Sequence, residues 1–170
     1  MLTDIFIIRH AQPTQFMGQN YNLPPGPDLS ERGRDEALQA ARFLADKGLQ
    51  HLFVSPFART TQTAEIVHEQ LDIPITFTRL VAEHAPHEDQ AQVRTRIQEL
   101  LAAADDAQAT CIGIISHGSP IKQLLLELTQ ERINLSQHTY AGGNPAPTAG
   151  IWHAQRRDNR WNLALVFTPT

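Results

Sequence analysis

The sequence contains a single cysteine, two lysines and no long apolar run, and each scarcity excludes a class of protein. Cys111, the one cysteine among 170 residues, cannot form an internal disulfide, and its apolar surroundings predict a buried thiol without a chemical role. No stretch approaches the roughly 20 apolar residues needed to span a bilayer. The sequence also begins without a basic leader and cleavage site. We therefore expect a cytoplasmic protein that does not associate with membranes.

Positive charge is sparse and scattered. Beside Lys47 and Lys122 there are twelve arginines, and the formal net charge is −4 with a pI near 6.0. The absence of a basic patch argues against a nucleic-acid partner. Any anion site must therefore be local, and the planar guanidinium of arginine suits bidentate recognition of a phosphate.

Apolar runs alternate with amphipathic segments, a pattern typical of an α/β protein with a mostly parallel sheet. The expected strands are 4–8, 51–54, 75–78 and 110–116, and the expected helices are about 31–46, a second from Arg59, about 89–104 and a fourth directly after His117. Residues 151–155 and 161–167 predict a C-terminal β-hairpin. We therefore expect one domain over residues 1–170, built as a three-layer αβα sandwich.

The first and the fourth expected strand each end next to a histidine. Arg9 and His10 follow the first strand, and His117 follows the fourth. Ligands of open α/β sheets bind beyond the carboxyl ends of the strands, so both imidazoles are expected at one edge. Gly118 and Ser119 then begin a helix, with Ser119 as its expected N-cap, and a helix N-terminus suits an anion.

Several local features together resemble the histidine phosphatase superfamily, also called the phosphoglycerate mutase-like family. They are Arg9-His10-Ala11, Ser55-Pro56-Phe57-Ala58-Arg59, Glu83, Ser116-His117-Gly118, and Asp28-Leu29-Ser30 with Gly33. Their order and spacing carry the resemblance from residue 1 to about 125. It implies a nucleophilic histidine at His10, a phosphate-binding histidine at His117, and an acidic residue near Glu83.

The chemistry of these residue types supports the same roles. A neutral imidazole, with an ordinary pKa around 6.5, can attack phosphorus without being repelled by the anion and can form a covalent intermediate. Phosphoryl transfer otherwise needs positioning and positive groups around the phosphoryl oxygens. We expect His10 to become phosphohistidine, with Arg9, Arg59 and His117 around the oxygens. A bound phosphate would favour protonated His117.

A leaving alkoxide needs a proton, and Glu83 is the expected general acid. Such a group is typically worth roughly 10² to 10⁴ in rate, and the same carboxylate could then activate water. Glu88 and Asp89 lie close enough in sequence to remain alternatives. Gln12 and Gly118 are further candidates for substrate binding.

Two residues of the first loop depart from the family pattern. Ala11 stands in place of a glycine, which is acceptable where φ is negative, and Pro13 stands where many members have a hydroxyl residue. In the same irregular loop, residues 12–29, Phe16, Met17 and Tyr21 either line a substrate mouth or fasten the loop.

The sequence therefore predicts a metal-independent phosphatase of phosphorylated small molecules or phosphoproteins, without a cofactor. The segment from His84 to Glu88 does not match a zinc pattern. Only 33 residues separate Glu83 from His117, too few for a helical insertion over the site, so we expect a shallow pocket and hydrolysis. The alternatives are a phosphoglycerate-type mutase and a non-catalytic phosphate-binding module. The oligomeric state stays open.

Overall fold

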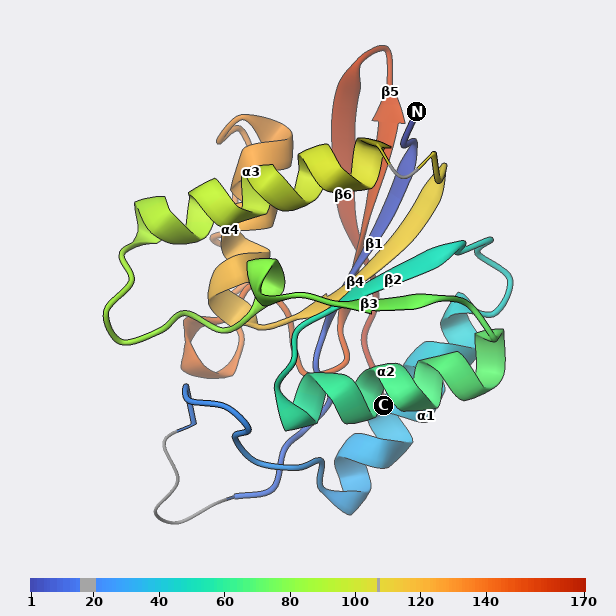
Figure 1. Ribbon diagram of the computed structural model, residues 1–170, viewed down its shortest axis with the longest axis vertical. Helices are drawn as coiled ribbons and strands as arrows, with labels where there is room; N and C mark the ends of the chain where they lie inside the picture. The colour runs from blue at the N-terminus through green and yellow to red at the C-terminus, as the bar shows by residue number, and fades with distance from the viewer. Residues whose placement is uncertain (16–20, 107) are drawn as a thin grey trace.

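The computed structural model describes residues 1–15, 21–106 and 108–170, and a six-stranded sheet lies at its centre (Figure 1). The strands are β1 (Asp4–Arg9), β2 (His51–Val54), β3 (Ile75–Phe77), β4 (Cys111–Ser116), β5 (Ile151–Arg157) and β6 (Arg160–Phe167). They are arranged in the order β3-β2-β4-β1-β5-β6. The first four strands in this order are parallel, and β5 and β6 continue the sheet as an antiparallel hairpin.

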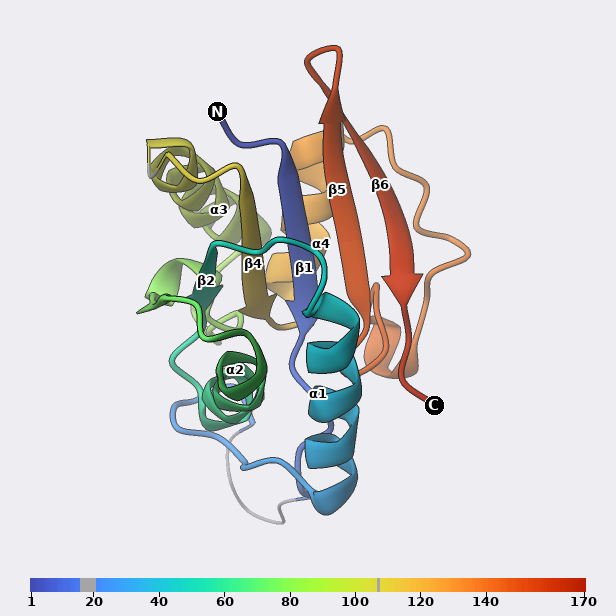
Figure 2. The same cartoon turned by 90° about the vertical axis from the view of Figure 1, so that its right-hand side faces the viewer.

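Helices cover both faces of this sheet, as Figure 2 shows. They are α1 (Glu31–Leu44), α2 (Ala58–Leu71), α3 (Gln90–Asp106) and α4 (Gly118–Thr129). Helices α1 and α2 lie on one face, and α3 and α4 lie on the other. The expected α/β fold, a three-layer sandwich with a mostly parallel sheet and a terminal hairpin, is confirmed.

Strand β1 illustrates why the central strands are apolar on both faces. Side chains alternate along a strand, so Ile5 and Ile7 pack into the core cluster with α3 and α4, whereas Phe6 and Ile8 pack into the cluster with α1 and α2. Burying an isoleucine fully stabilises the fold by about 1.5–3 kcal/mol. A continuous apolar run is therefore typical of a parallel strand between two helical layers.

Helix α1 begins where the sequence predicts. The Ser30 hydroxyl accepts a hydrogen bond from the Gly33 backbone nitrogen at 3.0 Å, which satisfies a donor that the first helical turn leaves without a partner. The helix ends at Leu44, two residues before the expected end.

The expected N-cap of α4 is wrong. His117, with extended backbone at φ −126° and ψ 172°, is the N-cap, and Gly118 is already helical, so Ser119 lies inside the first turn. The backbone at Gly118 approaches another segment closely, because a Cβ there would lie 1.6 Å from Asn144 Oδ1. The sequence could not show this contact between distant loops.

Two smaller predictions are confirmed. The C-terminal hairpin forms, and its strands are longer than expected, because β5 ends at Arg157 and β6 begins at Arg160. Asp158 and Asn159 connect them with positive φ, at 49° and 60°, as a type I′ turn requires. Cys111 is buried, and burial raises the pKa of its thiol to about 11, so the thiol is protonated at neutral pH. Within the described parts of the chain, no helix combines the length and the hydropathy of a membrane span.

Candidate active site

The two strand-end histidines lie side by side. Strands β1 and β4 are parallel neighbours with Arg9 opposite Ser116, so the residues that follow them leave the sheet at the same level. The His10 backbone nitrogen donates to the Ser116 carbonyl at 2.9 Å. The centroids of the His10 and His117 rings are 5.3 Å apart, with 54° between the ring planes.

A local hydrogen bond orients the His10 ring. Nδ1 lies 2.8 Å from the Ala11 carbonyl oxygen, and because a carbonyl only accepts, Nδ1 carries the proton. The lone pair of the neutral ring is then on Nε2. Ala11 is fully buried and is not among the residues with positive φ, so an alanine fits at this position without backbone strain.

Arg59 joins the histidines from the first turn of α2. Its side chain is fully buried, and Nη1 donates to the Tyr21 carbonyl at 3.1 Å. Thr63, one turn further along α2, donates to the Arg59 carbonyl at 2.6 Å and accepts from the Ala11 backbone nitrogen at 3.1 Å. The helix therefore positions both the arginine and the loop of His10.

Arg9 contributes the second guanidinium. Its Nη1 donates to the Ala146 carbonyl at 2.9 Å. Across the described residues, six buried side-chain nitrogens have no hydrogen-bond partner, and four of them belong to this cluster: Arg9 Nε, Arg59 Nε, Arg59 Nη2 and His117 Nδ1. Buried donors are usually satisfied, so such a concentration indicates a binding site. Tetrahedral oxyanions present the acceptors that these donors need.

Glu83 provides the carboxyl of the cluster. It follows the 3-10 turn η1 (Arg79–Val81), and its Oε2 lies 3.8 Å from both Arg59 Nη2 and His117 Nδ1. Burial is the main cause that raises the pKa of Glu83, opposed by a hydrogen bond from the His84 nitrogen and by nearby cations. A mostly buried carboxyl with a raised pKa keeps its proton to a higher pH than an exposed glutamate does, as a general acid requires.

The two alternative acids have other partners. Glu88 forms a bidentate ion pair with Arg96, at 2.8 Å and 2.9 Å, and hydrogen bonding to Arg96 lowers the pKa of Glu88. Asp89 Oδ1 accepts from the Gln92 backbone nitrogen at the start of α3. The structure therefore brings Glu83, and neither alternative, to the histidines.

Both imidazoles are neutral at pH 7 in this arrangement. Burial is the largest cause that lowers the pKa of each histidine well below 6.5, and the charges of Arg59 and Arg9 act in the same direction. The Ser55 hydroxyl lies 2.7 Å from Nε2 of His117 and fixes that ring. Ser55 begins the segment 55–59 that resembles the family, but the sequence analysis assigned no role to this serine.

The first loop covers this cluster. The centroid of the Tyr21 ring is 4.1 Å from Cζ of Arg59 and 6.5 Å from the ring centroid of His10. His10 and His117 are 1% and 0% exposed, so the site is deeper than the short interval before His117 predicts. Tyr21 therefore supports both interpretations of this loop: its ring lies beside His10, where it could line the site, and its contact with Arg59 fastens the loop. Phe16 and Met17 lie outside the described residues.

Gly26 allows the covering segment to approach Arg59. Its φ is +67°, and a Cβ there would lie 2.8 Å from Arg59 Nη1. The positive φ favours a glycine, because an L side chain would be strained in this conformation, and an added Cβ would also force the Arg59 guanidinium to shift.

The two remaining candidates occupy different surroundings. Gln12 is fastened to the start of α1, because its backbone nitrogen donates to Glu36 Oε2 at 2.9 Å and its Oε1 accepts from the Ser30 hydroxyl at 3.1 Å. These bonds position the first loop. Gly118 directly follows His117 and begins α4. Its backbone lies beside the Asn144 side chain.

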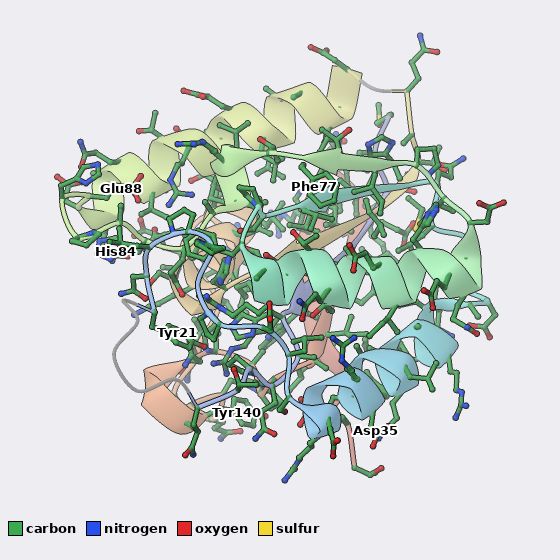
Figure 3. The ribbon with its side chains drawn as sticks, turned by 60° about the horizontal axis from the view of Figure 1, so that its bottom comes forward. Tyr21, Asp35, Phe77, His84, Glu88 and Tyr140 are labelled. Atoms are coloured by element: carbon green, nitrogen blue, oxygen red, sulfur yellow. The ribbon has the colours of Figure 1, made fainter. Side chains whose placement is uncertain are left out.

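A cavity of about 570 Å³ lies beside the cluster and includes Glu83 in its lining. In Figure 3, Tyr21 on the first loop lies next to the turn that carries His84 and Glu88, and Asn22 and Leu23 line the cavity together with Glu88. A larger hollow of about 710 Å³ lies on the β5–β6 hairpin and contains none of the cluster residues. Within residues 1–15, 21–106 and 108–170, no group of three histidine, cysteine or acidic residues is arranged to hold a metal ion.

Comparison with known proteins places this arrangement in context. Residues 5–85 match the family model of the histidine phosphatase superfamily (branch 1). No curated protein gives a significant match to the sequence. Among solved structures, the mycobacterial glucosyl-3-phosphoglycerate phosphatase is similar, at 18% identity and a TM-score of 0.77, over 96% of this chain and 97% of that chain.

Two SixA structures are also similar to this chain. The protein SixA from Agrobacterium tumefaciens has 19% identity and a TM-score of 0.74, over 99% of both chains. A protein histidine phosphatase SixA, solved with tungstate, has 21% identity and a TM-score of 0.67, over 95% of this chain and 94% of that chain. At these identities the structural likeness establishes the fold.

Proposed function

We propose that this chain, whose residues 5–85 match the histidine phosphatase superfamily, is a metal-independent phosphatase of phosphate monoesters or phosphoproteins. The observation that carries the proposal is the convergence of two histidines, two arginines and one carboxyl, with four unpartnered buried donors among them. The mycobacterial relative has been solved with inorganic phosphate and SixA with tungstate. Both anions support an oxyanion site in this fold.

In the first step, Nε2 of His10 attacks phosphorus as the bond from phosphorus to the leaving oxygen breaks. Arg9, Arg59 and His117 donate hydrogen bonds to the phosphoryl oxygens, where charge is spread in the transition state. The anion favours the protonated form of His117. Protonated Glu83 transfers its proton to the leaving oxygen, so that a neutral alcohol departs and the carboxyl becomes a carboxylate.

In the second step, water attacks the phosphorus of phosphohistidine and the bond between phosphorus and His10 breaks. The Glu83 carboxylate takes the proton from that water, which restores the acid for the next cycle. Free phosphate leaves, and His10 returns to its neutral form. A raised pKa at Glu83 suits both directions of proton transfer.

The first experiment compares wild type with His10→Ala on an aryl phosphate in the presence of a chelator. We expect phosphate release by the wild type, loss of release by His10→Ala, and an acid-labile, base-stable phosphoryl label on the wild type only. His68→Ala, at an exposed histidine of α2, is the matched control and keeps full activity.

Two outcomes of this comparison would contradict the proposal. Wild-type protein that binds phosphate but releases none from any ester would be a non-catalytic binding module. Isomerisation stimulated by bisphosphoglycerate without net phosphate release, measured in a coupled assay, would identify a mutase.

A further inference from the structure

The cavity beside Glu83 has a composition that the proposed hydrolysis does not explain by itself. We propose that it binds the leaving group of the substrate. It favours an alcohol with a planar hydrocarbon body and one anionic group besides the phosphate, and Arg79 recognises that anionic group. This inference rests on the proposed function, since the leaving group exists only if a phosphate ester is cleaved.

The position of Glu83, the proposed general acid, indicates which part of the substrate the cavity holds. A general acid must reach the leaving oxygen, so the leaving group lies on the side of Glu83, which lines the cavity. Phe57 lies between the cavity and the phosphate-binding residues. Its ring centroid is 4.9 Å from the His117 ring centroid and 4.9 Å from Cζ of Arg59. The phosphoryl end and the alcohol end of a substrate therefore have separate surroundings.

The walls of the cavity are mainly apolar and stiff. They include Leu23, Pro24, Pro56, Phe57, Ala82 and Ala85. Leu23 remains 47% exposed although it lines a concave surface. The two prolines hold the backbone rigidly and offer no N–H donor. Such walls suit a flat hydrocarbon body better than a polyhydroxylated one, which would lose its hydrogen bonds to water.

Of the two arginines and two glutamates that line the cavity, Arg79, which is exposed, is the one without an ion pair among the described residues. Arg96 is neutralised by its bidentate pair with Glu88 and also donates to the Leu80 carbonyl at 2.9 Å. Glu83 faces Arg59 and His117. Arg79 therefore leaves the cavity with one uncompensated positive charge.

The backbone at Arg79 is held in place. The Thr78 hydroxyl accepts from the Leu80 nitrogen at 3.2 Å, and the Ala82 nitrogen donates to the Arg79 carbonyl at 3.1 Å. A guanidinium carried on this short 3-10 turn presents a planar pair of donors, which suits a carboxylate or a second phosphate.

The test uses two phosphate esters of equal shape, 4-carboxyphenyl phosphate and 4-carbamoylphenyl phosphate. The readout is the ratio of their kcat/KM values, compared between variants so that the difference in intrinsic reactivity cancels. We expect Arg79→Gln to lower the preference for the carboxylate ester roughly tenfold, as the loss of a charged, partly solvated hydrogen bond predicts. Arg79→Lys should retain part of the preference, because it keeps the charge and loses the planar fork.

Arg42→Gln is the matched control, since Arg42 is exposed near the C-terminal end of α1, and it should leave both rates and their ratio unchanged. A second variant tests the apolar wall: Leu23→Asn should raise KM for both aryl esters while kcat changes little. Circular dichroism of every variant establishes that it is folded.

The outcomes separate the two proposals. If the wild type hydrolyses both esters but Arg79→Gln leaves their ratio unchanged, the role of Arg79 is wrong while the phosphatase stands. If the wild type hydrolyses neither these esters nor any other phosphate ester, the proposed function itself is wrong.

Discussion

Glu83 faces His117, with 3.8 Å between Oε2 of the carboxyl and Nδ1 of the imidazole. Burial is the first cause of both pKa shifts, and it raises the pKa of Glu83 and lowers that of His117. Each shift favours the neutral form, so the pair avoids an unsolvated charge until an anion arrives. Groups whose environments shift their pKa values in this way are typical of acid and base assignments in active sites.

Glu83→Gln tests the proposed role of Glu83 as the general acid. The variant cannot donate a proton, so we expect kcat/KM to fall by roughly 10² to 10³ for alkyl phosphates. The loss should be much smaller for 4-nitrophenyl phosphate, whose leaving group departs without protonation. Steady-state kinetics on the two substrates measure the difference, and Glu99→Gln, at an exposed carboxylate of α3, is the control.

The same assay distinguishes the alternative acids. Glu88→Gln and Asp89→Asn should show no dependence on the leaving group, since these carboxylates pair with Arg96 and with the start of α3. A strong dependence in either variant, with none in Glu83→Gln, would transfer the acid role to that residue.

Anion binding should be linked to proton uptake at His117. Its pKa lies well below 6.5 in the present arrangement, and a phosphate or vanadate beside the ring raises it. Binding therefore consumes a proton near neutral pH, and the affinity should weaken as the pH rises. Calorimetry of vanadate binding in buffers of different ionisation enthalpy measures the protons taken up.

His117→Gln should abolish most of this proton uptake, whereas His68→Gln should leave it unchanged. Uptake that persists at the wild-type level in His117→Gln would mean that another group titrates on binding.

Acid should destabilise the fold through the two buried histidines. Their folded pKa values lie below the unfolded value of about 6.5, so the unfolded chain binds protons first as the pH falls. The stabilisation is fully present above pH 6.5 and is lost below it, by up to about 1.4 kcal/mol per pH unit for each histidine. Urea unfolding between pH 7.5 and 5 measures this slope.

The variant His117→Gln should reduce the slope, because one of the two groups no longer titrates. An identical slope in wild type and variant would show that other residues control the acid sensitivity.

The position of the two histidines at one edge of the sheet could be predicted from the sequence, because it depends on local features of two strands. Apolar runs at β1 and β4 indicate strands that are buried on both faces, and parallel pairing places their carboxyl ends together. His10 and His117 therefore had to lie near one another once the strands were adjacent. Arg59 could be predicted because residues 55–59 resemble a segment of the histidine phosphatase superfamily.

Contacts between distant loops could not be predicted. The Arg59 guanidinium donates to the Tyr21 carbonyl, and Ser30 binds the Gln12 side chain. Neither bond has a signature in residue spacing. The sequence therefore predicted a shallow site, whereas the first loop covers the site in the structure. It also could not show that Gln12 is bound to the start of α1 and so positions the first loop. The close approach of the Gly118 backbone to the Asn144 side chain is another contact between segments distant in the sequence.

Thr63 provides the test of positioning, because its hydroxyl connects Ala11 to Arg59. Thr63→Val keeps the shape but leaves the Ala11 N–H without a partner, which should destabilise the fold by about 1–3 kcal/mol. It should also lower kcat about tenfold or more with little change in KM, since His10, the proposed nucleophile, attacks less well when it is displaced by a fraction of an ångström.

Thr129→Val is the control, because it removes a comparably buried hydroxyl from α4, which donates to the Leu125 carbonyl. That control should lose similar stability in urea unfolding and keep its kcat, and equal effects of the two variants on kcat would show that Thr63 acts through stability alone.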